Sequence, residues 1–136
     1  MRPINEIIIH CAATKPSMDI GADWIRKIHV RQNKWRNIGY HYFIRRNGAV
    51  EDGRPVEQIG AHCEGHNSKT IGICLAGGIS ETARPENNFT PEQFESLQLL
   101  INTLVDEFPR IIKLSGHNDY ANRACPCFNV HEKLKL

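Results

Sequence analysis

Glu6-Ile7-Ile8-Ile9-His10-Cys11 is an almost uninterrupted apolar run of the kind that forms a central strand buried on both faces. Residues 70–76 (Thr-Ile-Gly-Ile-Cys-Leu-Ala) form a second run of this type, which Gly77-Gly78 ends. Residues 111–114 form a third, shorter run. Helix-like segments alternate with these runs, so the sequence predicts a single α/β domain spanning residues 1–136.

The segments between the apolar runs predict a hairpin and a first helix. Residues 40–45 are expected to form a strand, because Asn47-Gly48 signals a tight hairpin turn into residues 49–51. Residues 22–33 have a helical pattern, with Ile25, Ile28 and Trp24 expected to face inward.

The clearest helix is predicted to start at Thr90. Thr90 is a good N-cap, Pro91 suits the first helical position, and Gln93 completes a capping box. Apolar residues then recur at spacings of three and four until Pro109, so one face of this helix should be buried.

Composition and charge exclude several classes of function. The formal net charge of the 136 residues is only +2, which implies no long-range field for nucleic acid or a membrane surface. Aromatic residues are few and are not interleaved with Lys or Arg, so no base-stacking platform is evident. We therefore expect no nucleic-acid or membrane partner, and a monomer is the default expectation.

The N-terminus and the cysteines bear on the compartment. Ile7-Ile8-Ile9 is shorter than the core of a signal peptide, so we expect synthesis in the cytoplasm without a signal peptide. An odd number of cysteines without an export signal argues against a disulfide framework and favours free thiols or a thiolate ligand.

Three residues are candidate metal ligands. His10 ends the first apolar run, His117 follows the last one, and Cys125 lies eight residues further on. Two imidazoles and one thiolate leave a fourth tetrahedral position for water, which is the catalytic arrangement of zinc. The alternative is that histidines at strand ends simply make hydrogen bonds, since no local motif connects His10 to His117. For Cys127, in the same Cys-Pro-Cys segment, we expect a small apolar side chain, either packed or exposed, rather than a ligand.

Several segments, taken together and in order, resemble the zinc amidases of the type-2 amidase and peptidoglycan-recognition family, above all the small podophage lysozymes. The resemblance runs from about Glu6 to His131. Its main motifs are Ile-Ile-Ile-His10-Cys-Ala-Ala-Thr-Lys-Pro-Ser, Gly39-Tyr-His-Tyr-Phe-Ile-Arg-Arg-Asn-Gly48, Gly60-Ala-His through Gly65-His-Asn67, Ile71-Gly-Ile-Cys-Leu-Ala-Gly-Gly78, Asn88-Phe-Thr-Pro-Glu-Gln93, Gly116-His117 and Ala124-Cys125-Pro126.

The resemblance implies a central mixed β-sheet flanked by helices, with an open groove that contains one Zn²⁺ per chain. It implies hydrolysis of the amide between N-acetylmuramic acid and L-alanine in peptidoglycan, at the cell wall after release. Position by position it implies that His10, His117 and Cys125 hold the zinc, and that Tyr40 and Arg123 are catalytic. It places His41, His62 and Asn67 where muramyl-peptide contacts are made.

One residue departs from the family pattern, because close relatives carry a lysine at the position of Arg123. A guanidinium is effectively always charged and is a poor proton donor to a leaving amine, but it can stabilise an oxyanion. We therefore expect activity with an altered rate or pH profile.

Three rival interpretations remain at the level of sequence. The chain could bind peptidoglycan without cutting it, although such family members typically lose the cysteine ligand, and Cys125 and Tyr40 are both present. It could regulate a phage RNA polymerase, although only five residues precede the first apolar run. It could also hold a structural zinc with four protein ligands.

Overall fold

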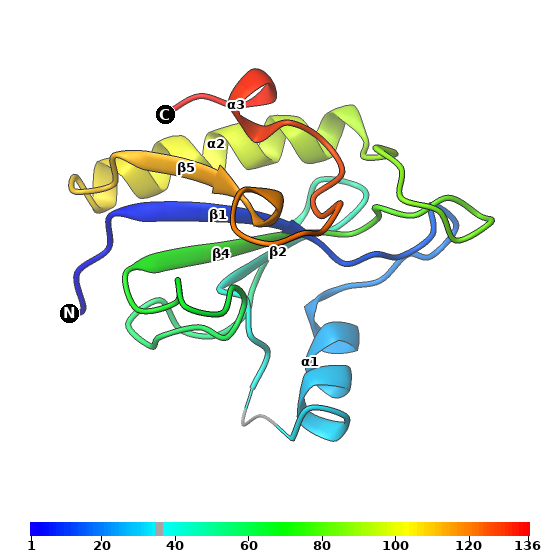
Figure 1. Cartoon of the computed structure of the whole chain (residues 1–136), viewed down its shortest axis with the longest axis horizontal. Coiled ribbons are helices and arrows are strands. Elements are labelled where there is room, and N and C mark those ends of the chain that lie inside the picture. Colours follow the sequence, from blue (N-terminus) through cyan, green and yellow to red (C-terminus); the bar gives the residue numbers. More distant parts are fainter. Residues whose placement is uncertain (35–36) are drawn as a thin grey trace.

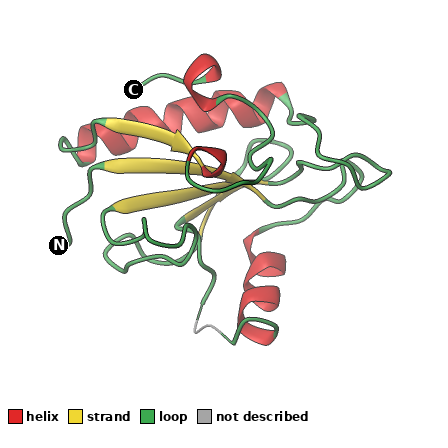
Figure 2. Cartoon of the chain, viewed as in Figure 1, coloured by secondary structure: helices red, strands yellow, loops and turns green. Residues whose placement is uncertain are grey.

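The fold is a mixed five-stranded sheet between helices, described from a computed structural model over residues 1–34 and 37–136 (Figures 1 and 2). The strands are β1 (Glu6–Cys11), β2 (Tyr42–Ile44), β3 (Val50–Asp52), β4 (Thr70–Leu75) and β5 (Lys113–Gly116). The helices are α1 (Ala22–Arg31), α2 (Pro91–Glu107) and the single turn α3 (Val130–Lys133), with a 3₁₀ turn, η1, at His117–Asp119. The predicted α/β class is confirmed.

The strand order is β3-β2-β4-β1-β5, so the first apolar run lies inside the sheet. Strand β1 pairs in parallel with β4 on one side and with β5 on the other, and β2 pairs in parallel with β4. Only β3, joined to β2 by the predicted hairpin, runs antiparallel. The carboxyl ends of the four parallel strands therefore meet at one edge, where sites in such sheets form.

Alternation along the strands separates two faces of the sheet. Ile7 and Ile9 of β1 and Ile71 of β4 belong to the larger core, which also includes buried residues of α2. Helix α2 covers this face of the sheet (Figure 1). Helix α2 is the element predicted from sequence: Thr90 accepts a hydrogen bond from the Gln93 N–H, and the Gln93 side chain accepts one from the Thr90 N–H.

The opposite face carries polar and small side chains beside apolar ones. Residues on this face include His10 of β1, which pairs in register with Cys74 of β4, and Ile8, which pairs with Gly72. A smaller apolar cluster that includes Ile25 of α1 and Phe43 of β2 covers part of this face. Loops cover the rest of this face, and the candidate site residues lie there.

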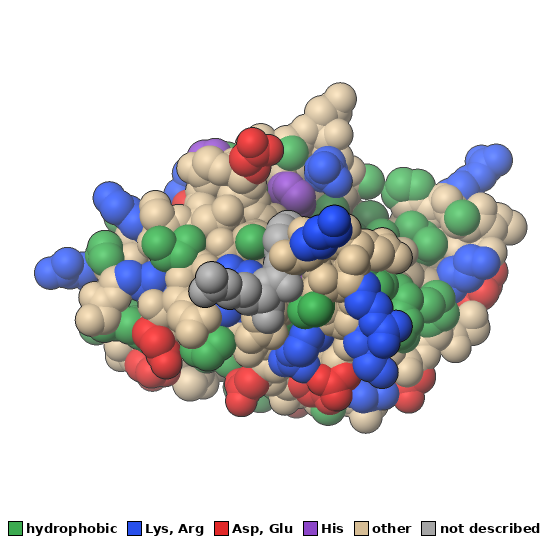
Figure 3. Space-filling view, turned by 90° about the horizontal axis from the view of Figure 1, so that it is seen from below, with side chains coloured by type: hydrophobic (Ala, Val, Ile, Leu, Met, Phe, Trp, Pro, Cys, Tyr) green, Lys and Arg blue, Asp and Glu red, His purple; other side chains and the backbone are tan. Residues whose placement is uncertain are grey.

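Some boundaries and orientations differ from those predicted. The final strand begins two residues later than expected, at Lys113, because Ile111 is buried ahead of it while Ile112 is 81% exposed. Ile25 faces inward as predicted, but Trp24 is exposed, so its expected inward orientation was wrong. On the face that carries α1, basic and acidic side chains are interspersed rather than segregated (Figure 3). Within the described residues, no helix is both long and apolar enough to cross a bilayer.

Candidate metal centre

His10 is the innermost residue of the site. It is the fifth residue of β1, and its side chain is fully buried. Its Nδ1 atom points toward His117 and its Nε2 atom points the other way, toward His62. Burial, followed by the neighbouring rings of His62 and His117, lowers the pKa of His10 well below its ordinary value. The imidazole is therefore neutral and has one nitrogen lone pair to offer a metal.

His117 approaches from the end of β5. The strand ends at Gly116, and His117 opens the η1 turn that follows it. Its Nδ1 atom lies 3.2 Å from Nδ1 of His10. Burial, followed by the charge of Arg123, lowers the pKa of His117, which again favours a neutral ring.

Cys125 completes the group from an irregular loop. The loop is fastened to η1 because the Asn118 N–H donates to the Cys125 carbonyl at 2.8 Å. The Cys125 Sγ atom accepts the backbone N–H of Cys11 at 3.1 Å. Ligand atoms of His10, His117 and Cys125 all lie within 4.8 Å of one another. The chain thus brings together the three candidate ligands that the sequence singled out.

The spacing of the two histidine nitrogens fits a tetrahedral ion. Two nitrogens at zinc-ligand distance and at the tetrahedral angle are about 3.3 Å apart, and a nitrogen and a sulfur are about 3.5 Å apart. The separation of 3.2 Å between the two Nδ1 atoms agrees with this geometry. A donor set of two imidazoles and one thiolate is a set that zinc takes in catalytic sites, with one position left for water.

Two further thiols, Cys11 and Cys127, lie near the candidate ligands. Hydrogen bonding to Cys125, followed by burial, raises the pKa of the Cys11 thiol, so Cys11 stays protonated. Cys127 instead donates to the Gly78 carbonyl at 3.2 Å and is half-buried, and burial raises its pKa to about 11. Cys127 is not part of the donor group, and all five cysteines are free thiols.

Tyr40 lies against the candidate metal centre from the β2 side. Its ring is tilted against that of His10, with 5.1 Å between centroids. Burial, followed by the Cys74, Cys125 and Cys11 thiols, raises the pKa of the Tyr40 phenol well above its ordinary value. The phenol therefore keeps its proton, and it can act as a hydrogen-bond donor.

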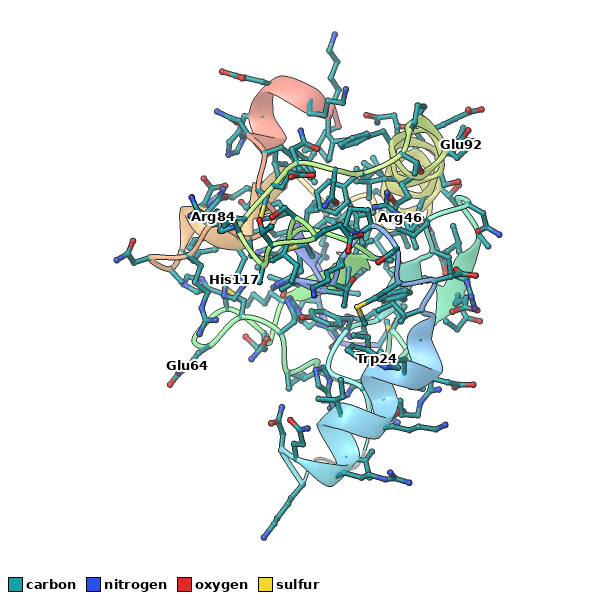
Figure 4. The ribbon with its side chains drawn as sticks, turned by 90° about the vertical axis from the view of Figure 1, so that its right-hand side faces the viewer. Trp24, Arg46, Glu64, Arg84, Glu92 and His117 are labelled. Atoms are coloured by element: carbon teal, nitrogen blue, oxygen red, sulfur yellow. The ribbon has the colours of Figure 1, made fainter. Side chains whose placement is uncertain are left out.

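A groove of about 740 Å³ opens beside His117 and is bordered by Arg123, whose side chain is exposed. Figure 4 shows His117 on the same side of the molecule as Glu64, which also borders the groove. The lining residues are Asn33, Ala61, His62, Cys63, Glu64, Gly65, Asn67, His117, Tyr120, Ala121 and Arg123.

The three residues expected to contact substrate lie in different surroundings. Asn67 and His62 border the groove, and the Asn67 side chain accepts the N–H groups of His62 and Cys63. His41 is 1% exposed and lies away from this groove, with its Nδ1 accepting the Gly72 N–H and its Nε2 beside Arg2 and the Gln58 carbonyl.

Sequence reasoning missed the residues that support the ligands. Thr70 and Gly72 of β4 lie directly beneath the ring of His62, and the Cys11 N–H contacts Cys125. Gly72 gave one signal, since a glycine inside an apolar strand often marks a close approach by another group. Thr70 gave none, because a threonine at the start of a strand is ordinary.

Comparisons with known proteins identify a family with similar sequence and fold. The family model described as N-acetylmuramoyl-L-alanine amidase matches residues 1–128. The endolysin of Klebsiella phage KP32 is 43% identical over 93% of this chain and 82% of its own length. A solved amidase, LysC from Clostridium intestinale, superposes with a TM-score of 0.81 at 31% identity, covering 94% of this chain and 79% of the amidase. A mutant of the Drosophila peptidoglycan-recognition protein LB, in complex with tracheal cytotoxin, has a TM-score of 0.74 at 26% identity, covering 93% and 76%.

Proposed function

This chain belongs to the N-acetylmuramoyl-L-alanine amidase family, and we propose that it lyses bacterial cell walls by zinc-dependent hydrolysis of the amide between N-acetylmuramic acid and L-alanine. The observation that carries the zinc dependence is the convergence of His10, His117 and Cys125 within 4.8 Å. Among the residues that the structure describes, the group has three donors, so a bound zinc would keep a fourth position for water, unlike a structural zinc with four protein ligands.

A zinc ion held by these residues would polarise a carbonyl group and lower the pKa of water. The chain's own residues supply the rest. His10 and His117 offer neutral nitrogens because burial lowers the pKa of both rings. The Cys125 sulfur is stabilised by the Cys11 N–H, which limits the charge that a thiolate would place on the metal.

Arg123 and Tyr40 are the proposed catalytic residues. The exposed guanidinium of Arg123 borders the groove beside His117, where it can stabilise the oxyanion that develops on the scissile amide. The Tyr40 phenol keeps its proton because burial raises its pKa, so it can orient water by donating a hydrogen bond. The groove would hold the muramyl peptide, with Asn67 and His62 on its wall.

Digestion of purified cell-wall sacculi tests this proposal. We expect fragments that carry a free lactyl carboxyl group and peptides that begin with a free L-alanine amine, and we expect a chelator to abolish both. Products cut at another bond, or release that continues undiminished in chelator, would overturn the proposal. Binding to sacculi without any release would favour a peptidoglycan-binding module.

A matched pair of cysteine variants ties the activity to the site. Cys125→Ser removes the thiolate ligand, and we expect it to lose zinc and hydrolysis together. Cys127→Ser changes the half-buried thiol two residues away, which bonds the Gly78 carbonyl, and we expect it to keep both. Equal losses in the two variants would mean that the segment matters only for folding.

A further inference from the structure

The buried side of His10 leads into a continuous series of hydrogen bonds. His10 Nε2 lies 2.9 Å from Nδ1 of His62. His62 Nε2 lies 3.1 Å from the Thr70 hydroxyl oxygen. That hydroxyl lies 2.7 Å from the backbone carbonyl of His66. The series thus starts at the metal centre and ends on a backbone acceptor.

The sheet is shaped to hold the ring of His62. A Cβ atom at Gly72 would lie 2.6 Å from the His62 ring, so the glycine at this point of β4 leaves the room that the ring occupies. His62 is 8% exposed, and the Asn67 side chain holds its backbone N–H at 3.0 Å. Both ring nitrogens are engaged inside the protein, so neither is available to a substrate without breaking one of these bonds.

The position of each proton in this series of hydrogen bonds follows from the group at its end, the His66 carbonyl. A carbonyl can only accept, so the Thr70 hydroxyl uses its single proton on the His66 carbonyl. The Thr70 oxygen must then accept from His62, which places a proton on His62 Nε2. A neutral His62 ring consequently has a bare Nδ1, which accepts from His10 Nε2–H.

This order decides which form of His10 faces the metal. With its proton on Nε2, the neutral His10 ring has its lone pair on Nδ1, the atom directed toward His117 and the metal position. The opposite order would put a proton on Nδ1 and block ligation. The carbonyl of His66 therefore controls, through Thr70 and His62, the tautomer of a ligand three hydrogen bonds away.

We propose that His62, oriented by Thr70 and seated on Gly72, is a positioning residue that presents His10 to zinc as the Nε2–H tautomer. The proposal rests on the proposed function only in taking zinc as the ion at His10. It differs from a substrate-binding role for His62, because the nitrogens of the ring point to His10 and Thr70 rather than to the groove.

Nitrogen NMR of the histidine rings in the zinc-loaded, ¹⁵N-labelled full chain tests the proton order directly. We expect His62 to be the neutral tautomer with hydrogen on Nε2 and a bare Nδ1. A proton on Nδ1 of His62 would overturn the proposal, because His10 would then have no acceptor for its Nε2–H.

Zinc affinity of a matched set of variants, measured by competition with a chromophoric chelator, tests the consequence. Loss of such a supporting partner typically weakens metal binding by about 10–100-fold. We expect His62→Leu to fall in this range and Thr70→Val to raise the zinc dissociation constant by roughly tenfold. Thr70→Ser keeps the hydroxyl and should stay within about threefold of the parent protein.

The control is Thr103→Val, which removes an exposed α2 hydroxyl that bonds the Leu99 carbonyl far from the series and should leave zinc affinity unchanged. Thr70→Val with parental affinity would overturn the proposal, and so would equal losses in Thr70→Ser and Thr70→Val. These two variants decide the matter even if His62→Leu does not fold. A parent protein that binds no zinc would overturn the proposed function itself, whereas parental zinc affinity in Thr70→Val would overturn only the positioning role.

Discussion

The guanidinium of Arg123 is exposed at the border of the groove, and its charge lowers the pKa of the neighbouring His117 ring, after the larger effect of burial. A guanidinium does not give up its proton at working pH, so Arg123 suits stabilisation of an oxyanion rather than proton transfer. In the proposed mechanism, an arginine at this position affects stabilisation of the oxyanion rather than proton transfer.

We predict that Arg123→Ala lowers kcat by about 100-fold or more while the zinc content stays at one per chain, since loss of one oxyanion donor has an effect of this size. Arg123→Lys should retain most of the activity because it keeps a cation at the groove border. The measurement is the rate of release from sacculi together with metal analysis of each variant. Unchanged hydrolysis in Arg123→Ala would remove this residue from the mechanism.

Some residues of the candidate site could be predicted from the sequence, and others could not. His10, His117 and Cys125 follow from position-by-position resemblance, whereas His10 and His117 are 107 residues apart and no local spacing predicts that they meet. The role of His62 was not predictable, because it depends on a hydroxyl, a carbonyl and a glycine that only the folded sheet brings beneath the ring.

At the scale of elements, helix α2 is fixed to the strands that form the site. The Gln93 side chain is fully buried and donates to the carbonyls of Ile44 and Ala76, just where β2 and β4 end. The Thr90 hydroxyl donates to the Arg46 carbonyl and also caps the helix. The capping box thus anchors both the helix and the adjoining ends of two strands.

We predict that Thr90→Ala lowers the free energy of unfolding by about 1 kcal/mol, the usual cost of losing such a cap. Zinc affinity should not change, because the cap lies on the α2 face rather than on the face of His10. Urea denaturation and chelator competition check the two halves of this prediction. A large loss of zinc affinity would show that the α2 anchor controls the metal centre.

In contrast to Thr90→Ala, the variant Gly72→Ala in β4 is expected to weaken zinc binding. The added Cβ would contact the buried His62 ring at 2.6 Å, so the ring must move away from His10. We predict that this variant loses zinc affinity by about tenfold or more, measured by the same chelator competition. If the Gly72→Ala variant folds and binds zinc as the parent does, the ring can shift without consequence.

Most elements were predictable from the sequence, whereas the bounds of β5 and the short helix α3 were not. Strand β1 coincides with the first apolar run, and α2 begins where Thr90, Pro91 and Gln93 predict. The last strand extends to Gly116 because pairing with β1, rather than local apolarity, sets its register. Helix α3 has a single turn and too few residues to give a periodic signal.

At the scale of the whole molecule, buried neutral histidines couple folding to pH. Burial, partly opposed by the Gln58 carbonyl, lowers the pKa of His41 to about 4, and burial lowers that of His62 to about 3. In the unfolded chain both rings have a pKa of about 6.5. Between these values the unfolded chain binds more protons than the folded one, so folding is favoured at higher pH.

We predict that the lowered pKa of His41 adds to the free energy of unfolding of the zinc-free protein, and that this stabilisation is complete above about pH 6.5. The stabilisation, up to about 3 kcal/mol, is lost as the pH falls toward 4. Urea denaturation at about pH 7.5 and about pH 4.5 in the presence of a chelator measures the loss across this window. His41→Asn, which can still accept the Gly72 N–H, should be less stable at the higher pH but less sensitive to pH. Parallel losses in the parent and the variant would exclude His41 as a source of the effect.

The proposed activity depends on two imidazoles and one thiolate from remote parts of the chain meeting around a single zinc ion. Zinc K-edge X-ray absorption of the purified protein tests this claim most directly. The prediction is one sulfur at about 2.3 Å, two imidazole nitrogens at about 2.0–2.1 Å and one further light atom. Two or more sulfurs around the zinc, or none, would contradict it.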